Sequence, residues 1–266
     1  MSAADPPGAI PFDDRGLLLG DGLFETLLFT RGELVLAEAH ARRMIDGAAA
    51  LGLPAPTVAA FMGCGLAAVR EAGFTASRAA VRVTLTAGSG GRGLDRPAAP
   101  QPRLFATAAL SVRPDSPASL FVAQIRRNQV SPTTRWKTLA YLDNVLARRE
   151  AVAAGADEAV MLNTLGQVAC AAAANLFWLH DGVLFTPAPE TGRLDGVMAR
   201  QAAAAAAKIG VELRQVRVGP EALGGADAVF LTNSLVGVRR AFLAGQAPPA
   251  PHTLVERLAG AVSRFV

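Results

Sequence analysis

Cysteine and aromatic residues are scarce in this chain of 266 residues. It has 2 Cys, and 6% of its residues are aromatic. Two cysteines are too few for the disulfide framework of a secreted module or for a Cys-rich zinc fold. Its three histidines, His40, His180 and His252, stand far apart, so we expect no metal site.

Clusters of positive charge and long apolar runs are missing as well. The formal net charge is +4, but the basic residues are scattered in runs no longer than Arg-Arg. Proteins that bind nucleic acid usually concentrate their charge and offer aromatic stacking surfaces, so we expect no nucleic-acid partner. Gly, Pro or Arg interrupts every apolar stretch before the ~18 residues of a membrane span, and the first residues do not resemble a signal peptide. These absences predict a cytoplasmic protein without a membrane partner, and the 51% hydrophobic content is ample for a core.

Lysine is as scarce as cysteine, because only Lys137 and Lys208 among the 26 basic residues are lysines. Arginine stays protonated and cannot act as a base or form an imine, whereas a lysine amine can. Lys208 ends an alanine-rich helical pattern just before Gly210, which is typical of a helix C-terminus. Lys137 lies between a loop and a helical pattern, and we identify it as the candidate for chemistry.

Hydrophobic periodicity predicts helices and strands that alternate along the chain. Helices are expected at 39–51, 57–72, 142–154, 197–209 and 253–265. Strands are expected at 23–29, 34–36, 78–87, 104–112, 120–125, 158–163, 175–180, 183–186, 212–218 and 228–232. A proline-containing segment separates two such groups, so we expect an α/β (α+β) fold of two lobes, 1–113 and 120–266, joined by a linker at 114–119.

A glycine-rich segment at 88–93 matches the dinucleotide pattern G-x-G-x-x-G. That motif binds a pyrophosphate only where a helix begins at the glycines. Pro97, Pro100 and Pro102 follow too closely for a helix to start there. We therefore interpret the segment as a surface loop.

Three features together suggest pyridoxal 5'-phosphate, although each also has an ordinary structural explanation. Lys137 is followed four residues later by Tyr141, and helical spacing would place both on one face. Val197 and Met198 open a predicted helix and would offer backbone N–H groups to a phosphate. Arg43, on the helix at 39–51, could add a bidentate phosphate contact. An imine-forming amine, a phenol and a phosphate anchor fit this cofactor.

Several short motifs follow one another along the chain in an order that is typical of one enzyme family. They are Asp14-Arg15-Gly16, Gly20-Asp21-Gly22-Leu23-Phe24-Glu25-Thr26, Glu38-Ala39-His40-Ala41-Arg42-Arg43-Met44, Lys137-Thr138-Leu139-Ala140-Tyr141-Leu142-Asp143-Asn144-Val145, Asp157-Glu158-Ala159, Gly166-Gln167-Val168, Asn175-Leu176-Phe177 and Phe230-Leu231-Thr232-Asn233-Ser234. In content and order they resemble the class IV aminotransferase family, the fold type IV enzymes that use pyridoxal phosphate.

The resemblance implies two α/β lobes with the cofactor between them, a small-molecule amino substrate and a homodimer. It implies that Lys137, in the C-terminal lobe, forms the Schiff base and moves a proton at the substrate carbon. Tyr141 would neighbour the ring oxygen, while Phe24 and Thr26 would lie toward the substrate. The resemblance also implies a set of residues that hold the phosphate: Arg43, Val197, Met198, Asn233 and Ser234.

One departure from the family pattern bears on the reaction. Cys170 stands where the family usually has a glutamate at the pyridine nitrogen, and a thiol is only a weak hydrogen-bond donor. A carboxylate there keeps the nitrogen protonated and makes the ring a deep electron sink, which transamination needs more than an elimination with an aromatic product. We therefore expect a lyase that converts 4-amino-4-deoxychorismate to 4-aminobenzoate and pyruvate in folate biosynthesis. An aminotransferase acting on branched-chain or D-amino acids, and a catalytically impaired paralogue, are the alternatives.

Overall fold

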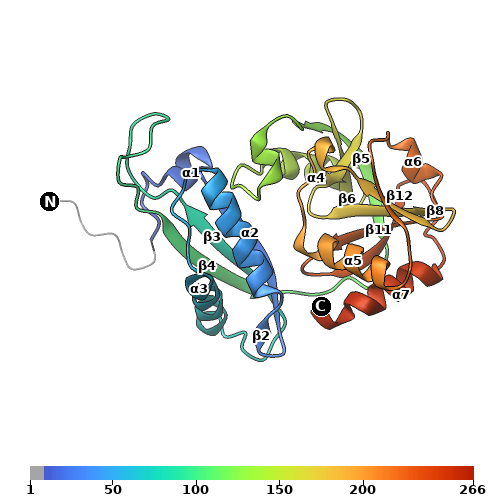
Figure 1. Cartoon of the computed structure of the whole chain (residues 1–266), viewed down its shortest axis with the longest axis horizontal. Coiled ribbons are helices and arrows are strands. Elements are labelled where there is room, and N and C mark those ends of the chain that lie inside the picture. The colour runs from blue at the N-terminus through green and yellow to red at the C-terminus, as the bar shows by residue number, and fades with distance from the viewer. Residues whose placement is uncertain (1–8) are drawn as a thin grey trace. The chain divides into compact units, whose positions relative to one another are not determined.

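The computed structural model describes residues 9–266, and its helices and strands are shown in Figure 1. Its mixture of helices and antiparallel and parallel strands confirms the predicted α+β class. By contacts the chain divides into two compact units, one ending at Leu110 but including Lys137–Ala140, the other formed by Ser111–Trp136 and Tyr141–Val266. The predicted linker at 114–119 overlaps the first strand of the second unit, and residues 1–8 of the predicted first lobe lie outside the described part.

The first unit is an antiparallel sheet with two long helices packed on it. Its strands lie in the order β2-β1-β3-β4, and α2 packs on β1 while α3 packs on β3 and β4. Leu27 and Val81, paired across β1 and β3, are fully buried. The elements are α1 (Arg15–Leu19), β1 (Gly22–Thr30), β2 (Glu33–Leu34), α2 (Ala37–Ala50), α3 (Val58–Glu71), β3 (Ala79–Thr86) and β4 (Arg103–Leu110).

Local signals in the sequence account for the ends of these elements. Thr57 Oγ1 accepts a hydrogen bond from Ala60 N at 3.1 Å, which makes it the N-cap of α3. Arg31 and Gly32 both adopt positive φ, the conformation that closes the hairpin between β1 and β2. The two helices predicted at 39–51 and 57–72 are therefore confirmed.

Residues 137–140 lie beside β1, where Thr138 forms an isolated antiparallel bridge with Leu23. Lys137 O accepts a hydrogen bond from Phe24 N at 2.9 Å, and Leu139 N donates to Gly22 O at 3.0 Å. The prediction that helical spacing brings Lys137 and Tyr141 to one face is therefore wrong. Pairing with β1 uses the backbone groups that a helix would need, and the next helix begins only after Tyr141. Contacts also group Lys137 with the first unit, whereas the sequence placed it in the C-terminal lobe.

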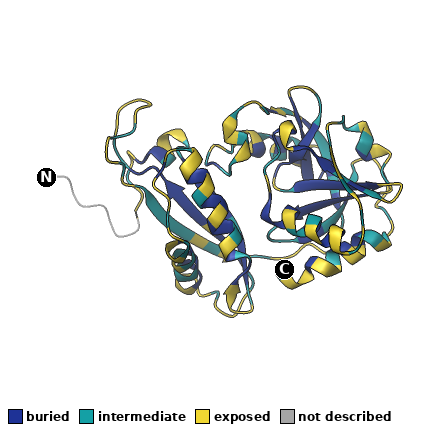
Figure 2. Ribbon diagram, viewed as in Figure 1, coloured by how far each residue is buried: buried dark blue, intermediate teal, exposed yellow. Residues whose placement is uncertain are grey.

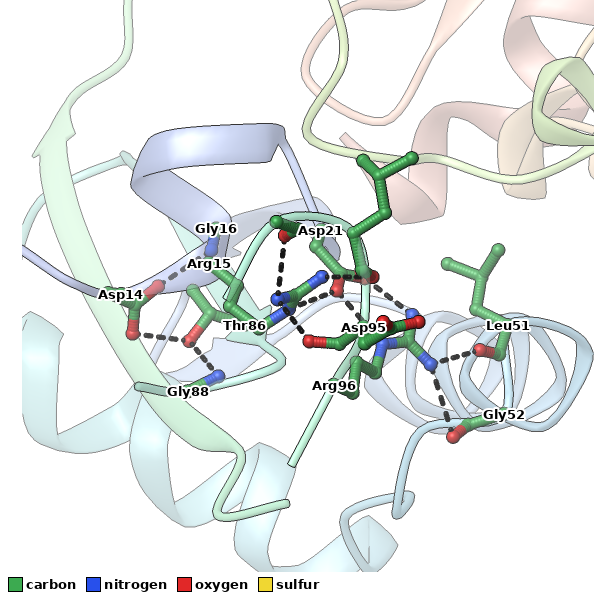
Figure 3. Close-up of polar contacts among 12 residues, drawn as sticks. Asp14, Arg15, Gly16, Asp21, Leu51, Gly52, Thr86, Gly88, Asp95 and Arg96 are labelled. Carbon is green, nitrogen blue, oxygen red and sulfur yellow. Dashed lines mark hydrogen bonds and ion pairs between the residues drawn. The ribbon is translucent and has the colours of Figure 1, made fainter. Parts of the chain in front are cut away.

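The glycine-rich loop that follows β3 is fastened by two arginines (Figure 3). Arg15 donates to the carbonyl oxygens of Leu94 at 2.8 Å and Asp95 at 3.0 Å, and its Nε donates to Asp21 at 2.9 Å. Arg96 donates to the same carboxylate, and its hydrogen bond lowers the pKa of Asp21. No helix opens within residues 88–96, which confirms the prediction that the segment is a loop.

The second unit is built on an eight-stranded sheet in the order β10-β9-β8-β11-β12-β5-β6-β7. Its strands are β5 (Ala118–Arg127), β6 (Glu158–Asn163), β7 (Val168–Ala171), β8 (Asn175–His180), β9 (Val183–Pro187), β10 (Leu213–Val216), β11 (Ala228–Asn233) and β12 (Gly237–Leu243). Its α-helices are α4 (Leu142–Ala153), α5 (Val197–Lys208), α6 (Glu221–Gly224) and α7 (Thr253–Val262), and its short 3-10 turns are η1 (Pro132–Arg135), η2 (Pro189–Thr191) and η3 (Ser263–Phe265). Figure 2 shows its central strands largely buried, and one core cluster includes Val160, Leu176 and Leu231.

Candidate functional site

Three charged or polar side chains form a buried network in the first unit. Glu25 comes from β1, while His40 and Arg43 lie one helical turn apart on α2. Arg43 Nε donates to Glu25 Oε1 at 2.7 Å, and Arg43 Nη2 donates to Oε2 at 2.6 Å. His40 Nδ1 lies 2.7 Å from the same Oε2. The side chains of Glu25 and His40 are each 1% exposed and that of Arg43 is 8% exposed, so the network is nearly dry.

The charges in this network follow from its contacts. Burial raises the pKa of Glu25, but the charge of Arg43 and the hydrogen bonds from His40 and Arg43 outweigh burial and bring that pKa to about 2. Burial lowers the pKa of His40, so its imidazole is neutral at pH 7. Because a carboxylate can only accept, the neutral ring must donate its Nδ1 proton to Glu25. The network therefore holds one negative and one positive charge.

Lys137 lies next to an aromatic ring from β1. Its Nζ stands 4.2 Å from the centre of the Phe24 ring, and the guanidinium carbon of Arg82 stands 3.5 Å from the same centre. Thr26, predicted to lie toward the substrate, is half-buried and is paired with Arg82 across β1 and β3. The structure thus places the candidate lysine beside Phe24.

The start of α5 in the second unit is a candidate anion site. This helix of 12 residues begins at Val197 after Gly196, which has no side chain to cap it, and its first turn carries no acidic residue. The first N–H groups of a helix point outward along its axis and favour negative charge. The side chains of Val197 and Met198 are both buried. Asp195, just before the helix, is balanced by Arg193 at 3.9 Å and Arg200 at 3.6 Å.

A buried asparagine fixes the position of this helix start. Asn175 Nδ2 donates to Leu194 O at 2.7 Å, and a Cβ at Gly196 would collide with Asn175 Oδ1. Asn175 is paired with Thr232 across β8 and β11, so the helix start lies near the end of β11. Thr232 Oγ1 is buried and has no hydrogen-bond partner within residues 9–266.

Substituting alanine for Gly196 should therefore disturb the start of α5. We expect the variant to lose about 1–3 kcal/mol of unfolding free energy, because the new methyl group forces Asn175 away from Leu194 O. Gly260 on α7 is the matched control, since a Cβ there meets open space. Urea denaturation should show Gly260→Ala at least as stable as the unsubstituted protein, and equal stability of Gly196→Ala would contradict the proposed contact.

Asn233 and Ser234, the two residues predicted to bind phosphate at the end of β11, lead into a tight turn. Asn233 Oδ1 accepts from the backbone N–H groups of Leu235 and Val236, both at 3.0 Å. Asn233 Nδ2 donates to Ala173 O at 3.3 Å. The Asn233 side chain therefore shapes the turn, and half-buried Ser234 follows it with a hydroxyl group that can donate to an anion.

Cys170 lies on β7 within an apolar cluster. It packs with Met161 of β6 and with Ala147 and Ala151 of α4, and it is 5% exposed.

Glu158 lies at the start of β6; burial raises its pKa, and backbone N–H groups, including that of Ala159 at 2.9 Å, partly offset this effect. Tyr141 stands at the N-cap of α4 and is half-buried.

Glu25, His40 and Asn175 were not assigned a function from the sequence, although the structure places them at the candidate residues. The described part of the chain contains no group of three His, Cys, Asp or Glu side chains arranged to hold a metal ion. Within residues 9–266, no helix is long and apolar enough to cross a membrane.

Comparisons with known proteins give consistent matches. The family profile described as "Amino-transferase class IV" matches residues 22–241. The putative branched-chain-amino-acid aminotransferase of Methanocaldococcus jannaschii is 30% identical over 83% of this chain and 77% of that protein. The aminodeoxychorismate lyase of Bacillus subtilis is 38% identical, over 44% of this chain and 40% of that protein. A crystal structure of a putative 4-amino-4-deoxychorismate lyase from Legionella pneumophila matches with a TM-score of 0.89 and 26% identity, covering 99% of this chain and 97% of the other.

Proposed function

This chain belongs to the class IV aminotransferase family, whose enzymes use pyridoxal phosphate, and we propose that it is an aminodeoxychorismate lyase. The proposed reaction converts 4-amino-4-deoxychorismate to 4-aminobenzoate and pyruvate. The observation that carries the choice of reaction is the buried thiol of Cys170, at the position where the family usually supplies a carboxylate. The similarity to the relatives named as lyases supports the same choice. A homodimer in the cytoplasm is part of the same proposal.

The residues of this chain fit the cofactor in chemical type. Lys137 supplies an amine beside an aromatic ring, and the uncapped start of α5, together with Ser234, supplies neutral donors for a phosphate. No acidic side chain in the first turn of α5 competes for these donors. Pyridoxal phosphate, when bound, supplies an aldehyde for amines and a ring that accepts electrons from a neighbouring bond.

The side chains then have the following proposed roles. Arg43, the N–H groups of Val197 and Met198, and the turn at Asn233 and Ser234 bind the phosphate. Tyr141 donates to the ring oxygen, and Phe24 and Thr26 contact the substrate. Lys137 would hold the cofactor through its aldehyde, and the Lys137 amine would be the base for the proton on ring carbon 4 of the substrate. The bond from the ring to the enolpyruvyl oxygen then breaks, the ring becomes aromatic, and the departing group takes up a proton to become pyruvate.

Product analysis tests this assignment directly. We expect the purified protein to release equimolar 4-aminobenzoate and pyruvate from 4-amino-4-deoxychorismate, at a rate unchanged by adding or omitting a 2-oxo acid. Chromatography of the aromatic product and a pyruvate assay provide the two measurements. Absence of 4-aminobenzoate would show that the chain is not this lyase.

An aminotransferase is the second candidate, because a relative matched over 83% of this chain is named as one. That activity would bleach the visible band of the bound cofactor when a branched-chain or D-amino acid is added, and a 2-oxo acid would restore it. A protein that does neither reaction would be a catalytically impaired paralogue.

A further inference from the structure

The buried network of Glu25, His40 and Arg43 is unusual for its position in the core. The core side chains of β1 and α2 include Leu27 and Met44, which are apolar and fully buried or nearly so. Burying a carboxylate and a guanidinium costs desolvation energy that their attraction only partly returns, and apolar residues of similar volume often stabilise a fold as well or better. Stability alone therefore does not explain why this charge pair occupies the core.

Hydrogen bonds within the network fix the orientation of the Arg43 guanidinium through one of its edges. The two nitrogens Nε and Nη2 donate to the two oxygens of Glu25, so the planar group is held in one orientation. His40 donates to Oε2 and holds the carboxylate in turn. Nη1 consequently points away from Glu25, at the opposite edge of the guanidinium plane.

We propose that Glu25 is a positioning residue that orients Arg43 toward the phosphate of the cofactor, with His40 as its support. This inference rests on the proposed function, in which Arg43 binds the phosphate. Glu25 itself does not touch the cofactor. Its contribution is to keep the guanidinium from turning, so that binding loses less side-chain freedom.

Comparing two cofactor forms separates positioning from general structural support. Pyridoxal lacks the phosphate but carries the same aldehyde, so its affinity does not depend on Arg43. For the cofactor-free full-length chain, we expect Glu25→Gln to weaken pyridoxal phosphate binding on the order of tenfold to a hundredfold, which is the range for a lost hydrogen bond to a charged group. The affinity for pyridoxal should change by less than about threefold. Titration followed by visible absorbance measures both dissociation constants.

Three further variants make the test decisive. His40→Leu leaves Glu25 and Arg43 paired and should lower the preference for the phosphorylated form in the same direction, by less. In an Arg43→Lys background, Glu25→Gln should add little to the loss of phosphate affinity. Asp21→Asn breaks the bonds from Arg15 and Arg96 in the same unit and should leave the preference unchanged.

The possible outcomes distinguish this inference from the proposed function. If the unsubstituted protein binds neither form, the proposed function fails. If it binds both, but Glu25→Gln weakens both equally or changes neither, the positioning role is overturned while the cofactor assignment stands. Should Glu25→Gln fail to fold, the His40→Leu titration decides, and an unchanged preference in that variant overturns the role.

Discussion

Replacing Lys137 with alanine is expected to lower turnover at least about a thousandfold, because a methyl group can neither hold the aldehyde nor accept a proton. The arginines of the chain cannot take over this role, because arginine stays protonated. The turnover of 4-amino-4-deoxychorismate measures the effect. Lys137→Ala turnover within about tenfold of the unsubstituted protein would contradict the role.

The scarcity of lysine provides an unusually clean control. Lys208 at the end of α5 is the other lysine of the chain, so Lys208→Ala should retain both activity and cofactor. Borohydride treatment of the loaded protein should fix a pyridoxyl group to Lys137, and mass spectrometry of peptides should find none on Lys208. Labelling of Lys208 alone would show that the cofactor binds Lys208 and not Lys137.

Glu25→Gln is expected to lower the unfolding free energy by about 3–5 kcal/mol at pH 7, because it leaves Arg43 buried without a counter-charge. The amide also turns one acceptor into a donor facing Arg43 or His40. Urea denaturation at neutral pH measures the loss. Glu38→Gln, which breaks an exposed pair with Arg42, is the control and should change stability little.

The pH dependence of stability identifies the carboxylate responsible. The pKa of Glu25 is lowered from 4.5 to about 2 in the folded protein. The stability it contributes, about 3 kcal/mol, is therefore complete above pH 4.5 and is lost as the pH falls toward 2. Over that window the difference between the unsubstituted protein and Glu25→Gln should shrink. A difference that stays constant would assign the effect to packing instead of charge.

The sequence was sufficient to predict the helices and strands that have strong hydrophobic periodicity and clear end signals. Strand 158–163 matches β6 in both bounds, and the turn at Asp181 and Gly182 has the positive φ angles expected of a tight hairpin. Strands β7 and β12 were missed. β7 is hidden in an alanine-rich segment with little β propensity, and β12 contains the pair Arg239-Arg240, which conceals its alternation.

The local structure around Lys137 could not be derived from spacing. An interval of four residues indicates one helical face only if the segment is helical, and here residues 137–140 pair with β1 from a distant part of the chain. Two features of the sequence indicate the residues of the buried network. Glu25 interrupts an apolar strand, and His40 and Arg43 are three residues apart on one face of a helix. The contact that joins the strand and the helix depends on tertiary packing.

The path of the chain through Lys137–Ala140 also limits how the protein can be divided. The chain enters the first unit a second time at Lys137 and leaves it after Ala140, so no single cut separates the two units. A fragment that ends at Leu110 keeps its four strands but lacks the backbone groups that satisfy Gly22 O and Phe24 N. The remaining fragment carries the candidate amine of Lys137 without the strand that holds it. Both halves must therefore be translated as one polypeptide, or recombined after synthesis, for that amine to be held in place.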